Sequence, residues 1–292
     1  CRRKESSAAS DVYKRQIYGL LGPNGAGKTT FIRIINQITA PDEGKIILNN
    51  QPLNKESIAH VGYMPEERGL YKNMKVGEQA MYFAKLKGLS HTEARDRTQY
   101  WFDKLGISSW WGKKLGELSK GMGQKVQFVI TVIHNPALLI FDEPFSGFDP
   151  VNASIIAQEI LELRDKGTTV IFSTHRMESV EEMCDHVALI NLSNKVLDGT
   201  IEEVRNQYKT GKYRIMLSNV AEEAFANFSQ HYSTENVLQT PFGHSFDLKF
   251  DKSISPNHVL SELAKVGEIH QFSEIIPSMN DIFLEAVQQS NH

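Results

Sequence analysis

The sequence has few cysteines and no long apolar run. Cysteine occurs only at Cys1 and Cys184, so no disulfide framework is available and a reducing compartment fits best. The longest apolar stretches, such as ALLIF at 137–141, are far shorter than the roughly 20 residues that a membrane span needs. We therefore expect a cytoplasmic chain that does not itself cross a bilayer.

The sequence also lacks an excess of charge of one sign. Its formal net charge is −3, whereas nucleic acid and anionic lipid both attract a basic surface. We therefore expect no nucleic-acid partner. No internal repeat or low-complexity segment is evident, and 292 residues are enough for more than one domain.

Strands and helices alternate over the first two thirds of the chain. IYGLL at 17–21 and ALLIF at 137–141 are typical of buried strands, and 29–38 carries apolar residues at helical spacing. Continuous apolar strands that alternate with helices predict an α/β fold with a mainly parallel sheet covered on both faces. The pattern is helical at about 70–135, which we interpret as a helical insert, and a short antiparallel β part is expected after the turn PDEG at 41–44.

The pattern changes after about residue 205. The order of the expected elements is β-α-β-β-α-β, which is the split βαβ pattern. We therefore predict a small ferredoxin-like α+β accessory domain at 205–292. Its expected strands lack the dense aromatic and basic residues that base stacking requires, which argues against RNA binding by its sheet.

The segment GPNGAGKTT begins directly after the first expected strand. It matches G-x-x-x-x-G-K-[ST] at every fixed position, and it lies between a strand and a helix. Glycines allow the backbone N–H groups to point at phosphate oxygens, lysine reaches the β- and γ-phosphates, and the hydroxyl that follows binds Mg²⁺. The candidate residues for ATP and Mg²⁺ are Gly22, Asn24, Gly25, Gly27, Lys28, Thr29 and Thr30.

Two carboxylates end the strand at 137–141. Asp142 is a candidate ligand of hydrated Mg²⁺, together with Thr29 of the phosphate loop. Glu143 is a candidate catalytic base that polarises a water toward the γ-phosphate.

Taken together, the motifs resemble one family. GPNGAGKTT, LSKGM at 118–122, FDEP at 141–144, SGFD at 146–149 and STH at 173–175 follow one another as in the nucleotide-binding subunit of an ABC transporter. The resemblance covers about 17–204, which we take as the ATP-binding domain. The stretch 62–76 is similar to bacterial exporters of the sodium-extruding type, and the part from 205 onward resembles a small domain that many of those subunits carry.

The resemblance implies a dimer of two copies that sandwiches two ATP molecules. Ser119 and Gly121 of one copy would contact the γ-phosphate held by Lys28 of the other. Asp149 would communicate across the interface, and His175 would sense the γ-phosphate.

The sequence departs from the family pattern at two places. Lys120 and Met122 replace a glycine and a glutamine of the usual LSGGQ signature. The family's loop glutamine is here Glu66, whose oxygen is expected to face Mg²⁺ or the catalytic water while adding negative charge beside ATP.

The resemblance also implies a partner. We expect the Mg²⁺-dependent ATPase subunit of an exporter, attached near Glu66 to a separate transmembrane permease on the inner face of the cell membrane. The alternative is a soluble ABC ATPase of translation or DNA repair. Those usually carry two cassettes or long coiled-coil or zinc insertions, whereas this chain has one phosphate loop and no cysteine cluster.

The start of the chain has a different character. Residues 6–16, SSAASDVYKRQ, match the in-frame translation of a transposase-type sequencing adapter over the whole segment. We therefore expect residues 1–16 to be a non-native tail, and the N-terminal edge strand and adenine-stacking aromatic residue of the family to be missing. The alternative is a flexible native tail, since KESSAAS at 4–10 is polar and small.

Overall fold

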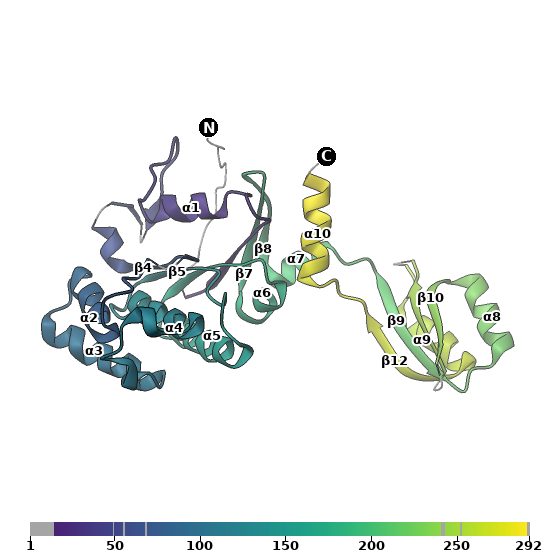
Figure 1. Cartoon of the computed structure of the whole chain (residues 1–292). Coiled ribbons are helices and arrows are strands. Elements are labelled where there is room, and N and C mark those ends of the chain that lie inside the picture. Colours follow the sequence, from purple (N-terminus) through teal and green to yellow (C-terminus); the bar gives the residue numbers. More distant parts are fainter. Residues whose placement is uncertain are drawn as a thin grey trace. The chain divides into compact units, whose positions relative to one another are not determined.

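The computed structural model describes residues 15–48, 50–54, 56–67, 69–240, 243–251 and 253–290. The chain divides into two compact units, coloured along the sequence in Figure 1. Unit 1 extends to Ile201 and includes the segment that begins at Phe283, and unit 2 is Glu202–Ile282. Of the expected tail, only Arg15 and Gln16 belong to the described residues, so its interpretation stays a prediction.

Unit 1 is built on a six-stranded sheet with the order β4-β5-β6-β1-β7-β8. Neighbouring strands are parallel except β7 and β8, which form an antiparallel hairpin. All residues of β1 and β5 are buried, as continuous apolar runs require. The expected mainly parallel α/β sheet is confirmed. The strands are β1 (Ile17–Leu21), β4 (Val61–Met64), β5 (Leu138–Asp142), β6 (Thr169–Ser173), β7 (His186–Asn191) and β8 (Asn194–Thr200).

Helices cover both faces of this sheet (Figure 1). On one face, α1 (Lys28–Ile35) packs Ile32 and Ile35 into a core cluster with Leu20 and Ile140. On the other, Phe128 of α4 (Lys120–Val132) stacks on Phe141 of β5. Adjacent residues of β5 thus face opposite helices, which is the alternation that a strand imposes. Two further helices, α5 (Pro150–Asp165) and α6 (Met177–Met183), follow β5 and β6.

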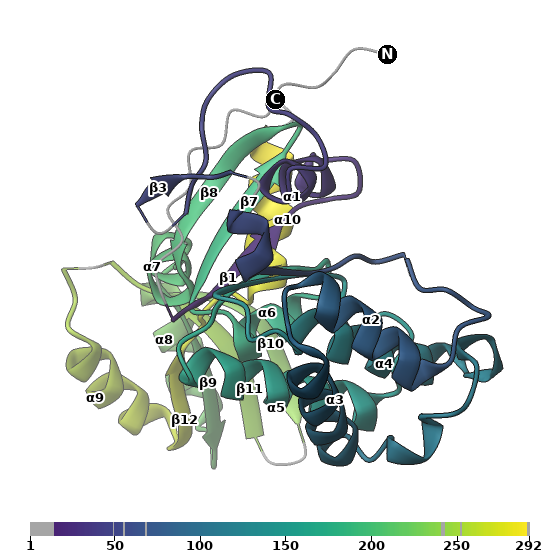
Figure 2. The same ribbon diagram turned by 90° about the vertical axis from the view of Figure 1, so that its left-hand side faces the viewer.

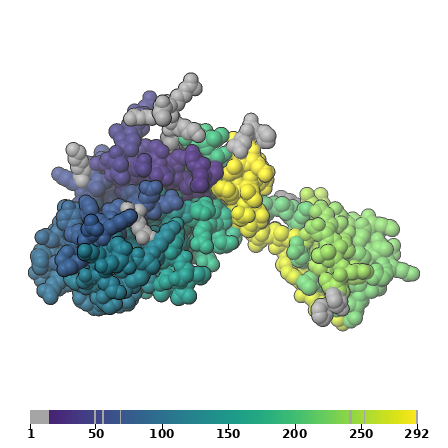
Figure 3. Space-filling view, in the orientation of Figure 1, coloured from purple at the N-terminus to yellow at the C-terminus, as the bar shows by residue number. Residues whose placement is uncertain are grey.

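A group of helices occupies one side of unit 1, as Figure 2 shows. It consists of α2 (Val76–Leu86), α3 (His91–Lys104) and α4. Ser90 caps α3 by a capping box with Glu93, and Trp101 of α3 contacts the ring of Phe128 edge-on. In the space-filling view of Figure 3 these helices form one continuous body with the rest of unit 1. They lie where the helical insert was expected.

A two-stranded antiparallel hairpin, β2 (Ile47–Leu48) and β3 (Gln51–Pro52), follows α1. The expected antiparallel β part is therefore present. Across the described part of the chain, none of the helices combines the length and the hydropathy that crossing a membrane would require.

Unit 2 contains a four-stranded antiparallel sheet with the order β10-β11-β9-β12. Its element order is β-α-β-β-α-β, the split βαβ arrangement. Ile215 and Phe246 of the sheet share a core with Phe228 and Leu263 of the helices. The elements are β9 (Lys212–Ser218), α8 (Glu222–His231), β10 (Ser233–Thr240), β11 (Gly243–Lys249), α9 (Pro256–Val266) and β12 (Glu268–Glu274).

Two helices contain the boundaries between the units. The first, α7 (Ile201–Gln207), begins at the last residue of the first part of unit 1. The second, α10 (Met279–Ser290), begins in unit 2 and ends in unit 1. We expected an accessory domain over 205–292, whereas the segment from Phe283 onward packs with unit 1. Ala286 is buried there, and Ser290 is hydrogen-bonded to Asn191 of β7.

Candidate functional site

The phosphate loop connects β1 to α1 and has a backbone that requires glycine. Gly22, Gly25 and Gly27 have φ angles of 151°, 80° and 109°, in the region that side chains disfavour. A Cβ atom at Gly22 would also lie 2.2 Å from the carbonyl oxygen of Ile190. Gly27 precedes α1 without a side-chain cap, so the first N–H groups of this helix remain available to an anion.

Lys28 is buried at the start of α1. Its Nζ donates to the carbonyl oxygens of Gly22 at 2.6 Å and Pro23 at 3.2 Å, so the ammonium folds back over its own loop. Burial lowers the pKa of this ammonium, and the charges of three nearby carboxylates oppose that shift. These carboxylates are, in order of effect, Glu143, Asp142 and Glu66. The positive charge of Lys28 therefore interacts with the negative charges of all three carboxylates.

Asp142 is the last residue of β5 and is only 4% exposed. Burial raises the pKa of its carboxyl group, and the charges of Glu143 and Glu66 raise it further. A divalent cation would relieve this repulsion, and the carboxylate oxygen is the ligand that Mg²⁺ prefers. Among the described residues no three His, Cys, Asp or Glu side chains could hold a metal by themselves. Because Mg²⁺ at such sites is held by one or two carboxylates and by substrate phosphates, the residues present fit this ion.

Glu143 is held at the edge of the sheet by the end of the neighbouring strand. Its own N–H donates to Ser173 O at 2.9 Å, and its φ of 51° is left-handed. One carboxylate oxygen, Oε2, accepts from Thr174 Oγ1 at 3.1 Å. The other, Oε1, accepts from the backbone N–H of His175 at 2.9 Å and lies 2.7 Å from its Nδ1. These contacts fix the orientation of the carboxylate, as a catalytic base requires.

Glu66 follows β4, the strand next to β5, and is exposed. Its charge acts on both Asp142 and Lys28, so the structure brings it to the same group. The backbone before it is anchored to the helical group, because Gln127 of α4 donates to Pro65 O at 2.9 Å. This loop therefore joins the carboxylate group to the helices of unit 1.

The remaining loop residues are accessible. Asn24, Thr29 and Thr30 are exposed, and both threonines lie in the first turn of α1. Their side chains are therefore accessible to a phosphate group and a cation that arrive from solvent.

Ser119, Gly121 and Asp149 belong to a second cluster. Ser119 caps α4 by accepting from Met122 N at 3.3 Å, and Asp149 caps α5 by accepting from Asn152 N at 2.9 Å. A Cβ atom at Gly121 would lie 3.3 Å from Gly147 O, so the start of α4 packs against the turn before α5. The hydrogen bonds from Asn152 lower the pKa of the Asp149 carboxyl group.

The sequence alone missed two contributors. Thr174 was seen only as the middle residue of STH, although its hydroxyl holds Glu143. Gln127 lies in the apolar α4 and belongs to no motif, although its side chain donates to Pro65 O and so anchors the loop of Glu66. A polar residue on a buried helix face is the signal that was available, since such side chains are hydrogen-bonded when buried.

We expect Glu66→Gln to change the metal dependence of ATP hydrolysis more than it changes ATP affinity. The substitution removes one of the charges that raise the pKa of Asp142, while it keeps an oxygen at the same place. Activity should be titrated with Mg²⁺ for the parent and the variant, with the exposed Glu67→Gln as the control. Superimposable Mg²⁺ titrations would argue against a metal-facing role for Glu66.

Comparisons with known proteins show which family the chain resembles. A family model described as "ABC transporter" matches residues 6–146, and one described as "ATP-binding protein DrrA1-3-like, C-terminal domain" matches residues 199–287. An uncharacterised ABC transporter ATP-binding protein, YhaQ of Bacillus subtilis, is 37% identical over 95% of this chain and 91% of its own. The ABC transporter ATP-binding protein NatA of the same organism is 33% identical over 70% of this chain and 86% of its own.

A solved structure has the same fold. It is cbiO1 from Clostridium perfringens, described as part of the ABC transporter complex cbiONQ. The TM-score is 0.62 with 26% sequence identity, over 70% of this chain and 84% of that one.

Proposed function

Because the chain belongs to the ATP-binding proteins of ABC transporters, we propose that it hydrolyses ATP to drive an exporter through a separate membrane permease. The observation that carries the proposed hydrolysis is the fixed carboxylate of Glu143 beside the phosphate loop. Thr174 and His175 hold it, and its charge acts on Lys28. Export rather than import is supported by the exporter-like stretch at 62–76.

The proposed chemistry follows from the placement of the charges. Lys28 exchanges its bonds to Gly22 O and Pro23 O for phosphate oxygens, while the N–H groups of the loop and of α1 bind the same phosphates. Glu143 orients a water and accepts its proton, because the hydrogen bonds from Thr174 and His175 fix the orientation of its carboxylate. His175 senses the γ-phosphate, and its contact with the Glu143 carboxylate links the two residues. Mg²⁺, held by Thr29 and Asp142 and faced by Glu66, would neutralise charge that develops on the phosphates.

We propose that a second copy completes the site. Ser119, Gly121 and Asp149 lie at the N-terminal ends of α4 and α5, which carry partial positive charge. By the resemblance to the family, these residues would serve the nucleotide held by the other copy. In this arrangement the chain lies on the inner face of the membrane as a peripheral dimer.

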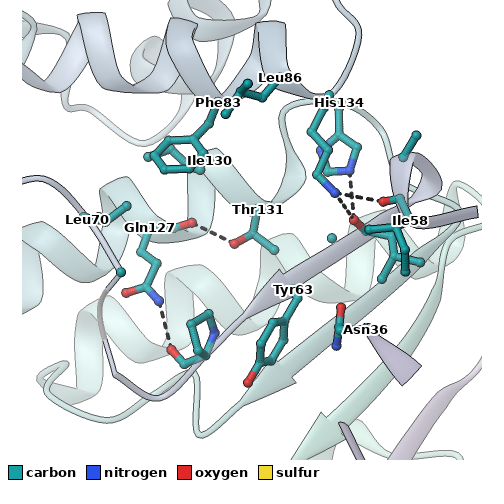
Figure 4. Close-up of a pocket in the computed structure, with 16 residues that line it drawn as sticks. Asn36, Ile58, Tyr63, Leu70, Phe83, Leu86, Gln127, Ile130, Thr131 and His134 are labelled. Atoms are coloured by element: carbon teal, nitrogen blue, oxygen red, sulfur yellow. Dashed lines mark hydrogen bonds between the residues drawn. The ribbon is translucent and has the colours of Figure 1, made fainter. Parts of the chain in front are cut away.

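The proposed docking site for the permease is a groove of about 530 Å³ beside the Glu66 loop. Figure 4 shows its lining, with Tyr63 of β4 and Phe83 and Leu86 of α2 around an open space. Its apolar rim includes exposed Leu86, and large exposed apolar surface is typical of interaction sites. Pro65 and Leu70 of the loop also line it, so one loop borders both the groove and the carboxylates.

The groove also contains a cation. Lys87 Nζ donates to Ile58 O at 2.9 Å and to Val61 O at 2.8 Å, and burial lowers the pKa of its ammonium. His134 lies beside it, with Nε2 3.3 Å from Val61 O. Burial and then the charge of Lys87 lower the pKa of His134 to about 4, so the imidazole is neutral at physiological pH. A partner segment that combines apolar side chains with a carboxylate would complement this groove.

We expect Leu86→Asp to prevent attachment to the permease without impairing hydrolysis. The exposed side chain lies on the groove, and a carboxylate there would be buried against apolar side chains of the partner. The chain should be co-expressed with its membrane subunit, to be sought among the neighbouring genes, and the amount recovered with that subunit in detergent should fall about tenfold or more. Ile47→Asp, at a similarly exposed apolar residue of β2, is the control. Equal recovery of both variants would contradict docking at this groove.

A further inference from the structure

The phosphate loop is supported from behind by the turn between β7 and β8. Asn191 pairs with Asn194, so the hairpin turns at Leu192 and Ser193. The N–H of Ser193 donates to Ala26 O at 2.9 Å. A Cβ atom at Gly27 would lie 3.4 Å from Ser193 Oγ. The turn therefore contacts the second half of the phosphate loop directly.

This turn has a conformation that its residues disfavour. Leu192 and Ser193 have φ angles of 48° and 68°, where asparagine and glycine are the usual residues of such a hairpin. Leucine and serine have a Cβ atom that disfavours positive φ angles, and neither has the amide side chain of asparagine. Contacts with surrounding residues must therefore hold the turn in place. Ser193 is buried at 2% exposure, whereas the Leu192 side chain is exposed. Contacts of the neighbouring residues are thus required to fix the turn.

One such contact comes from the end of α10. The side-chain amide of Asn191, which is only 4% exposed, donates to Ser290 Oγ at 2.7 Å. The hydroxyl of Ser290 in turn donates to Val287 O at 3.0 Å. The hydroxyl group of Ser290 therefore acts both as an acceptor and as a donor, which fixes its orientation. Ser290 is the last residue of α10.

We propose that Asn191 and Ser290 are positioning residues for the phosphate loop. Their hydrogen bond fixes the residue before the strained turn, and the turn fixes Ala26 and Gly27 through Ser193. The curvature of the loop, and with it the direction of the N–H groups that bind phosphate, then depends on the last turn of α10. The inference rests on the proposed binding of ATP at this loop.

Ser290→Ala removes the hydroxyl group and leaves the amide of Asn191 without that acceptor. We expect the dissociation constant for ATP and the KM to rise about three- to tenfold, with kcat at saturating ATP within twofold of the parent. A tenfold rise corresponds to about 1.4 kcal/mol, the upper part of the range for one hydrogen bond. This change does not alter the contacts of Glu143 and His175, so kcat should remain close to that of the parent.

Two variants separate positioning from general stability. Ser290→Thr keeps the hydroxyl group and should restore the parent affinity, and Gln289→Ala removes the exposed neighbour that bonds Glu285 at 3.0 Å and should leave affinity unchanged. Adding Ser290→Ala to Asn191→Ala should weaken ATP binding no further, because both remove the same hydrogen bond. The measurements are ATP titration of the intact chain and steady-state kinetics.

The outcomes are distinct. A parent chain that binds no ATP would refute the proposed function itself. If the parent binds ATP and Ser290→Ala binds it as tightly as Gln289→Ala does, the positioning role is refuted. The role is refuted equally if the threonine variant fails to recover affinity, or if kcat falls in parallel with affinity.

Discussion

We expect Glu143→Gln to reduce the turnover of ATP about a hundredfold or more and to leave ATP binding nearly intact. The glutamine oxygen still accepts a hydrogen bond from Thr174 or from the N–H of His175, so the site keeps its shape. The amide cannot accept the proton of the attacking water, and a positioned base contributes about 10² to 10⁴ in rate. Because the charge of Glu143 also acts on Asp142, its removal additionally lowers repulsion beside bound nucleotide.

Single-turnover hydrolysis and ATP titration test this expectation together. Glu182→Gln changes an exposed glutamate of α6 in the same way and is the matched control. A Glu143→Gln protein that turns over within a few fold of the parent would show that another group activates the water.

Lys28→Ala acts on binding itself. We expect the dissociation constant for ATP to rise at least a hundredfold, because charge-assisted hydrogen bonds to phosphate are lost from a buried site. The variant also removes the ammonium whose charge interacts with Asp142 and Glu143, so the carboxylates repel the nucleotide more strongly.

Binding should be measured with the fold monitored by circular dichroism, since Lys28 also bonds the carbonyl oxygens of Gly22 and Pro23. Lys45→Ala, at an exposed lysine, provides the control. Should the folded Lys28→Ala protein bind ATP as the parent does, the loop would not be the phosphate site.

The order of elements and the phosphate loop could be predicted because local sequence determines both. The glycine spacing at 22–27 requires a curled loop, and the apolar run before Asp142 requires a buried strand. The position of Lys28 over its own loop could not be predicted, because it depends on hydrogen bonds to Gly22 O and Pro23 O that only the folded loop offers. The left-handed backbone of Glu143 could not be predicted either, since it results from contacts with the end of β6.

The return of α10 was also invisible in the sequence. The pattern MNDIFLEAVQQS predicts a helix, and in the sequence it directly follows the elements of unit 2 from β10 to β12. Periodicity identifies which face of a helix is buried but not which surface buries it. The segment from Phe283 onward was therefore assigned to the domain that precedes it, whereas its residues pack with unit 1.

The place of α10 in the chain has a consequence for synthesis on the ribosome. Unit 1 is interrupted at Ile201 and receives its last segment only after Ile282. At about 5 to 20 residues per second, the intervening residues take several seconds to emerge, which is long enough for unit 2 to fold first. During that interval the nascent unit 1 lacks the acceptor that Asn191 uses in the finished protein. Nucleotide affinity would then mature only after Ser290 has left the exit tunnel.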